Sequence, residues 1–169
     1  VVVRYVRHLR GSDVSIELVA PDKPLEPGFA DATRATQIID ALLARCTKYA
    51  LPGGLIRARL GEDEDGRPQV RIFDAGGGIP AAACEELFAL ASYSGLPGAP
   101  RWSGMEPAVL KALADGMDAK LSAEVLNDEI VWSLSLVKAP EDAERPQSEF
   151  MFEDEEDASA SDDDALPPV

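Results

Sequence analysis

Residues 74–80 read Asp-Ala-Gly-Gly-Gly-Ile-Pro and place a carboxylate directly before a run of glycines. The segment before them, residues 69–74, alternates apolar and other side chains, which predicts a half-buried strand that ends at Asp74. A carboxylate at a strand end can accept a hydrogen bond from an exocyclic amine such as N6 of adenine, and glycines allow close approach to the backbone. Glycine is also the default residue of tight turns. The stretch is therefore either a turn or the floor of a nucleotide pocket.

A second group of candidate residues lies in residues 31–49, where apolar side chains recur at helical spacing and predict an amphipathic helix that ends before Pro52. The apolar stripe consists of Ile38, Ile39, Leu42, Leu43, Cys46 and Tyr49, and a different face carries Arg34, Gln37, Ala41, Arg45 and Lys48. Cys46 and Cys84 match no metal or redox spacing, so we expect both to be reduced thiols in the core.

The remaining periodic segments supply the elements that position these residues. Strands are predicted over residues 14–20, 55–60, 69–74, 120–126 and 130–136, and further helices over residues 80–90 and 103–117. Ser103 and Glu106 fit a capping box at the start of the last helix. The final two strands form a hairpin in which Leu121, Ala123 and Val125 face Ile130, Trp132, Leu134 and Leu136. Strand pairs that alternate with helices predict an α+β two-layer sandwich, a mixed β-sheet covered on one face by helices.

The net charge of −15 is concentrated near the C-terminus. Residues 141–169 contain twelve acidic residues and one arginine, a charge of −11, which leaves −4 for residues 1–140. Low hydrophobicity and like charge predict that residues 139–169 form a disordered acidic tail. Within it, Phe150-Met151-Phe152 is either a docking motif or incidental to a solubilising segment, and we favour the second. Because no cluster of Lys and Arg is present, we expect no binding to nucleic acid or to an anionic membrane.

We predict that residues 1–13 are a connecting helix that leads into the domain. Because the chain does not begin with Met, we expect it to be a piece of a longer protein with an upstream segment. These residues have no signal-peptide layout, and no apolar run is long enough to span a bilayer, so we expect a cytoplasmic location. His8 is the only histidine, and we expect it to be solvated and not to be a phosphorylation site.

In their order along the chain, these elements resemble the ATP-binding domain of sensor histidine kinases, which shares its fold with gyrase, the mismatch-repair ATPases and a family of chaperones. The resemblance runs from about residue 14 to residue 137, and we place the domain at residues 14–138. Its most specific part is residues 74–80, which match the family's D-x-G-x-G-I-P box. The resemblance implies that Asp74 reads adenine and that Gly76, Gly78 and Ile79 belong to the pocket wall.

The helix over residues 31–49 departs from the family at the metal ligand. Residues 42–49 align with the family's L-L-x-N-A-x-K-Y motif, in which the Asn coordinates magnesium; Lys48 and Tyr49 match, but Arg45 stands at the Asn position. A guanidinium group has no acceptor and cannot ligate a cation. Ala41 stands where hydrolytic members of the fold keep a water-activating Glu, so hydrolysis of that kind has no base. We therefore expect no magnesium site and weak or no binding of ATP.

The second glycine box of the family, G-x-G-L-G-L, aligns with residues 102–107, where only Gly104 remains. In the family this helix start binds phosphate through backbone N–H groups, and Pro107 has none. Glu106 would place a carboxylate beside the triphosphate, and two unit charges about 4 Å apart at an effective dielectric of about 20 repel by about 4 kcal/mol. Arg45 could bind phosphate directly or pair with Glu106 and fill the site, and we favour the pairing.

Three functions fit this pattern. The one that we favour is a degenerate, pseudokinase-like domain that acts as a regulatory or docking module in bacterial two-component signal transduction. The alternatives are a working ATP-binding domain of a sensor histidine kinase and an accessory domain of a histidine phosphotransferase, the latter by analogy alone. The expected partners are a response-regulator receiver domain or the helical domain of a kinase, and a homodimeric parent protein. We assign no catalytic residue, and the pattern leaves open whether the chain is an enzyme.

Overall fold

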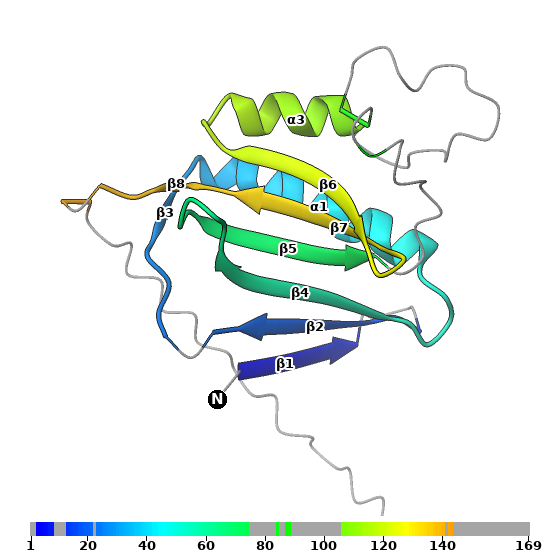
Figure 1. The fold of residues 1–169 in the computed structure, drawn as a ribbon. Coiled ribbons are helices and arrows are strands. Elements are labelled where there is room, and N and C mark those ends of the chain that lie inside the picture. The colour runs from blue at the N-terminus through cyan, green and yellow to red at the C-terminus, as the bar shows by residue number, and fades with distance from the viewer. Residues whose placement is uncertain are drawn as a thin grey trace, which may run out of the picture.

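The computed structural model describes residues 3–8, 13–21, 23–74, 84, 87, 88, 106–140, 142 and 143. Helices α1 (Ala32–Tyr49) and α3 (Pro107–Asp115) cover one face of a six-stranded sheet (Figure 1). Its strands, in spatial order, are β1 (Val3–His8), β2 (Ser15–Ala20), β4 (Leu55–Glu62), β5 (Pro68–Asp74), β7 (Glu129–Ser135) and β6 (Lys120–Leu126). Two short strands, β3 (Gly28–Phe29) and β8 (Val137–Lys138), pair separately. The predicted α+β two-layer sandwich is confirmed.

The sheet is mixed, as predicted. Strands β2 and β4 are parallel, and all other neighbouring strands of the large sheet are antiparallel. The β6–β7 hairpin turns through Asn127 and Asp128, whose φ angles of 52° and 63° suit a two-residue turn that follows the twist of the strands. The cross-strand pairs of the hairpin are those predicted for its inward face: Leu121 with Leu134, Ala123 with Trp132, and Val125 with Ile130.

The N-terminal segment is a strand, so the connecting helix predicted for residues 1–13 is wrong. Strand β1 pairs antiparallel with β2, from Val3 opposite Ala20 to His8 opposite Ser15. Its valines and tyrosine favour a strand, and the pairing satisfies the backbone groups along the outer edge of β2. The prediction for the His8 side chain lies outside what the structure describes.

Helix α1 begins and ends where its sequence predicts. The carboxylate of Asp31 accepts a hydrogen bond from the backbone N–H of Arg34 at 3.1 Å, which caps the first turn. The helix ends at Tyr49, and the loop that follows uses a positive φ of 73° at Gly53. The described part of the chain contains no helix that is both long and apolar enough to cross a membrane.

Helix α3 begins later than predicted. Its N-cap is Glu106, whose side chain makes no capping hydrogen bond, and Pro107 occupies the first helical turn. Proline suits this position because its fixed φ fits a helix and an N–H there would have no helical partner. The predicted capping box needs Ser103 as the N-cap and Glu106 three residues later. Because Glu106 is itself the N-cap, the box is not formed as predicted. Ser103 lies outside the described residues.

The core fills the space between the helices and the sheet. It includes Ile38 and Leu42 of α1, Leu110 of α3 and Trp132 of β7, all completely or almost completely buried. Cys46 and Cys84 are also buried and form no disulfide, which confirms the prediction of reduced core thiols. Of the helix predicted over residues 80–90, Cys84 is helical and Leu87 is buried, and most of the rest lies outside the described residues.

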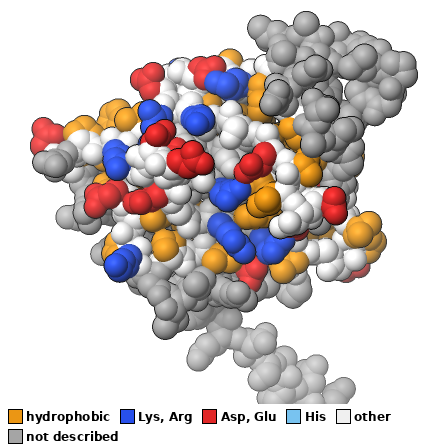
Figure 2. All heavy atoms as spheres, in the orientation of Figure 1, with side chains coloured by type: hydrophobic (Ala, Val, Ile, Leu, Met, Phe, Trp, Pro, Cys, Tyr) orange, Lys and Arg blue, Asp and Glu red, His pale blue; other side chains and the backbone are white. Residues whose placement is uncertain are grey.

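Within the described residues, no helix covers the other face of the sheet, and many charged side chains lie on it (Figure 2). One large apolar residue on this face, Phe73, is nevertheless only 7% exposed. The guanidinium carbons of Arg57, Arg59 and Arg71 lie 5.3, 5.1 and 5.6 Å from the centre of its ring. The arginines thus cover the ring by cation–π contact, which explains how an aromatic side chain is tolerated here.

Candidate functional site

The last residue of β5, Asp74, lies against the C-terminal half of α1. Alternation along β5 directs Asp74 to the helix-covered face, as it does Ile72, and the residue is only 2% exposed. Arg45 of α1 is completely buried, and its Nε lies 3.6 Å from Oδ2 of Asp74. The carboxylate that the sequence assigns to a ligand is therefore engaged in a buried ion pair within the protein.

Two aromatic rings enclose the Arg45 guanidinium. Its carbon lies 4.8 Å from the centre of the Tyr49 ring, one helical turn further along α1, and 5.6 Å from the centre of the Trp132 ring on β7. Phe88 meets Trp132 edge to face, with ring centres 6.5 Å apart. Because guanidinium is planar and weakly hydrated, stacking on aromatic faces offsets part of its desolvation. We call Arg45, Tyr49, Asp74 and Trp132 the Arg45 cluster.

Cys46 adds a second contact to Asp74. Its thiol donates a hydrogen bond to the carboxylate. Burial raises the pKa of the Cys46 thiol far above its ordinary value, the charge of Asp74 raises it further, and the charge of Arg45 opposes the shift. The thiol therefore stays protonated at neutral pH and remains a hydrogen-bond donor to Asp74.

The space beside the Arg45 cluster is small. A cavity of about 90 Å³ lies against Asp74 and is lined also by Cys46, Ala50, Leu51, Gly54, Leu55 and Ile56. Pockets for small organic ligands usually enclose roughly 300–1,000 Å³. This cavity is thus smaller than such a pocket.

The structure brings some of the predicted site residues together and leaves others apart. Asp74 and Tyr49 meet at Arg45, whereas Lys48 is exposed, with its ammonium 5.6 Å from the centre of the Tyr49 ring. Glu106 is exposed at the start of α3. Four other predicted positions, Gly76, Gly78, Ile79 and Gly104, lie outside the described residues.

The predicted pairing of Arg45 with Glu106 is wrong, because the carboxylate that Arg45 meets is Asp74. The prediction that Arg45 belongs to a face other than the apolar one also fails, since Arg45 is as buried as Leu42. Sequence reasoning missed the roles of Cys46 and Trp132 as well. The available signal was spacing: Arg45 follows Leu42 by three residues and precedes Tyr49 by four, which puts all three on one side of a helix.

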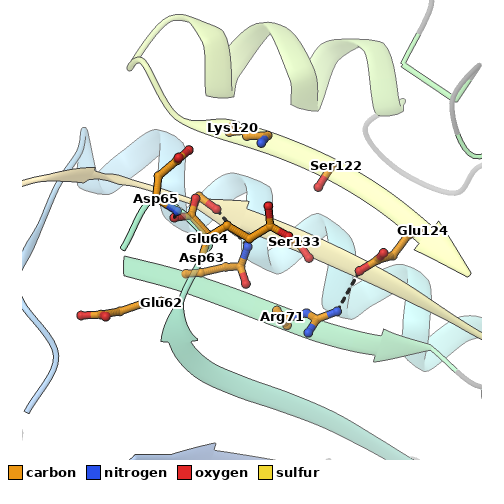
Figure 3. A pocket seen from close by; sticks show the side chains of 11 residues that line it. Glu62, Asp63, Glu64, Asp65, Arg71, Lys120, Ser122, Glu124 and Ser133 are labelled. Carbon is orange, nitrogen blue, oxygen red and sulfur yellow. Dashed lines mark hydrogen bonds and ion pairs between the residues drawn. The ribbon is translucent and has the colours of Figure 1, made fainter. Parts of the chain in front are cut away.

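A separate polar hollow of about 390 Å³ lies on the open face of the sheet (Figure 3). The β4–β5 turn forms one side of it, where Oδ1 of Asp63 accepts hydrogen bonds from the backbone N–H groups of Asp65 and Arg67. Across the hollow, Arg71 donates to Glu124 at 2.8 Å. Carboxylates outnumber cations in its lining, which consists of Glu62, Asp63, Glu64, Asp65, Gln69, Arg71, Lys120, Ser122, Glu124, Ser133 and Ser135. Such a lining disfavours phosphate, so the hollow is no substitute for a nucleotide site.

Solved structures of sensor histidine kinases share this fold. The mycobacterial sensor histidine kinase MprB is 21% identical over 76% of this chain and 86% of its own, with a TM-score of 0.59. The catalytic domain of histidine kinase ThkA is 19% identical over 76% of this chain and 82% of its own, with a TM-score of 0.60. Full-length ShkA in complex with AMPPNP is 20% identical over 75% of this chain and 27% of its own, with a TM-score of 0.55.

No family model and no curated protein matches the sequence. The likeness is thus one of architecture: the mixed sheet with helices on one face matches the fold of these histidine-kinase catalytic domains. The resemblance stated from the sequence is confirmed for the fold.

Proposed function

We propose that this domain is a degenerate histidine-kinase-like module of two-component signalling that binds ATP weakly or not at all and acts in the cytoplasm through contacts with proteins. The observation that carries the proposal is the buried ion pair between Arg45 and Asp74. In a domain of this fold, Asp74 stands where an adenine amine would have to be accepted. Here the same carboxylate already meets a guanidinium and a thiol.

Adenine could reach Asp74 only if Arg45 moved away. Separating a buried ion pair costs about 3–5 kcal/mol because it leaves a charge in the interior without its counter-charge. Each 1.4 kcal/mol is a factor of ten in affinity, so the loss would be roughly a hundredfold to a few thousandfold. This argument supports weak binding without requiring that the fold be damaged.

The described residues also fit a magnesium triphosphate poorly. Arg45 has only donors, so it cannot replace the Asn that ligates magnesium in the resembling family. At the start of α3, Glu106 presents a carboxylate and Pro107 lacks an N–H, so this helix end offers phosphate a repulsive charge and one donor fewer. No catalytic step is therefore assigned to bound nucleotide, and the expected partners remain a receiver domain or the helical domain of a kinase.

A working ATP-binding domain is the second candidate, and one observation favours it. Lys48 is exposed beside Tyr49 at the end of α1, where a cation could still contact a phosphate. The solved ShkA structure, which shares the fold, contains AMPPNP. The two candidates differ in whether Arg45 blocks the site or is displaced from it.

Titration of the full chain with AMPPNP, with and without magnesium chloride, separates the candidates. We expect no measurable heat for the wild-type chain and recovery of binding in Arg45→Asn, with a further gain in Arg45→Asn/Glu106→Gly. Arg57→Asn, which removes a guanidinium from the open face, is the matched control and should not bind. Micromolar, magnesium-dependent binding by the wild-type chain that disappears in Asp74→Asn would overturn the proposal in favour of the working domain.

A further inference from the structure

A second surface feature lies at the other end of α1, far from the Arg45 cluster. A groove of about 420 Å³, which we call the Phe29 groove, is lined by Phe29, Ala30, Asp31, Met117, Asp118 and Val137. Asp31 caps the first turn of α1, and Arg45 comes fourteen residues later, about 21 Å along the helix axis. The groove is therefore independent of the site discussed above.

The phenyl ring of Phe29 is held outward by the backbone. It is 62% exposed, although a single exposed phenyl group is costly to hydrate. A Cβ at the neighbouring Gly28 would lie 2.9 Å from Cδ1 of Leu136, so strand β3 packs directly against that side chain. Side chains alternate along a strand, so Phe29 points away from Leu136 and towards solvent. An apolar side chain fixed in this way, next to Met117 and Val137, forms a ready contact surface.

We propose that the segment Phe150–Met151–Phe152 of the same chain docks into the Phe29 groove. The chain itself leads there: Val137 forms one wall, and the N–H of Ala139 donates to the carbonyl of Pro27 at 2.8 Å, which fixes the exit point of the chain next to the groove. The described chain runs to Ala143. The seven residues from there to Phe150 can span at most about 25 Å.

The composition of the tail selects this segment as the occupant. Residues 144–169 contain ten acidic residues and one arginine, and within them Phe150, Met151 and Phe152 are the only three consecutive large apolar residues. Aromatic rings and a thioether match a groove that presents Phe29 and Met117, through edge-to-face and sulfur–aromatic contacts. Tethering over so few residues gives an effective concentration in the millimolar range, so a modest affinity is sufficient.

Charge predicts the salt dependence of the contact. Asp31 and Asp118 line the groove, and the docking segment is flanked by Glu149 and Glu153. These like charges oppose docking, and added salt screens them. Apolar contact that works against charge repulsion should strengthen at high salt, whereas an ionic contact of the acidic tail should weaken. The sign of the salt effect therefore distinguishes the proposal from simple attraction of an acidic tail.

The test compares backbone amide NMR spectra of full-length chains. Phe150→Ser/Phe152→Ser should shift the amides of residues 29–31, 117, 118 and 137 and leave residues 45–49 unchanged. Leu166→Ser, which removes an apolar side chain further along the tail, is the control and should leave the groove amides unchanged. Phe29→Ser should shift the amides of residues 150–152, and Leu51→Ser, at a residue 74% exposed at the other end of α1, should not.

Three outcomes would overturn the proposal. Groove amides that do not respond to the tail variant would show that the segment does not dock. The groove would be assigned to a second copy if the shift disappears on dilution. The same holds if unlabelled wild-type chain returns the groove amides of the labelled tail variant to their wild-type positions. A response that is lost at high sodium chloride would assign the contact to the acidic residues and not to the apolar ones. None of these results depends on nucleotide binding.

Discussion

Asp74→Asn tests the Arg45 cluster most directly, because it removes one charge and changes the volume little. At the observed 3.6 Å and an effective dielectric of about 20, the attraction between the two charges is roughly 5 kcal/mol. Measured losses on removing one partner of a buried pair are about 3–5 kcal/mol. We expect Asp74→Asn to lower the free energy of unfolding by about this amount, because it leaves the Arg45 guanidinium buried without its counter-charge.

Arg45→Met is the complementary change. Methionine retains an apolar side chain of similar reach that can still pack on Tyr49 and Trp132, but it leaves the Asp74 carboxylate without its cation. The loss should again be about 3 kcal/mol or more. The double variant Arg45→Met/Asp74→Asn buries neither charge, and should lose much less than the sum of the two single changes. A coupling of at least about 2 kcal/mol is expected.

Urea denaturation of the full chain, followed by circular dichroism at neutral pH, gives the four stabilities that the cycle needs. Arg45→Lys, which retains the charge, supplies a milder variant if Arg45→Met does not fold. The matched control is Arg57→Met/Glu129→Gln on the open face, where the side chains are 33% and 25% exposed and their closest atoms are 2.5 Å apart. Screening by solvent should limit that coupling to about 1 kcal/mol. A coupling at Arg45 no larger than the control would refute the buried ion pair.

Three further predictions concern single residues. In the native chain, Cys46 should react with iodoacetamide only as fast as the structure opens, because burial raises the pKa of its thiol; mass spectrometry showing rapid native labelling would contradict this. Asp31→Ala should lower the free energy of unfolding by about 1 kcal/mol through loss of the α1 cap, and an unchanged urea midpoint would argue against the cap. Burial alone would raise the pKa of Asp63, but hydrogen bonds, first among them that from the N–H of Arg67, hold it below its ordinary 3.8. Its contribution to stability is therefore present above that pH and lost as the pH falls through the lower folded value, so the deficit of Asp63→Asn should shrink in acid urea titrations.

Most elements of the fold could be predicted because their signals are local. The alternation in residues 69–74 and the helical stripe of α1 are complete within single segments, and both elements form within a residue or two of the predicted bounds. The turn at Asn127 and Asp128 could likewise be predicted from its residue types. The polar hollow on the open face was not predicted, because it combines a turn with side chains from four strands.

The failures of prediction concern long-range pairing. Residues 3–8 form a strand because they pair with β2, and no pattern within residues 3–8 predicts that pairing. Arg45 is buried because β5 brings Asp74 beneath α1, and the charge of Glu106, although present in the sequence, faces solvent. A helix position that reads as polar can thus belong to the core when a distant strand supplies a counter-charge.

The pairing of β5 with β7 has a consequence for how the chain folds and varies. Asp74 pairs with Ile130, so the β5–β7 ladder closes a loop of 55 residues that contains α3 and β6. The entropy of closing a loop rises only with the logarithm of its length, by about 0.6 kcal/mol for each doubling. Insertions or deletions between β5 and α3 should therefore change the folding equilibrium little. Formation of this ladder is expected to limit the folding rate, because the closure must precede the contacts that stabilise it.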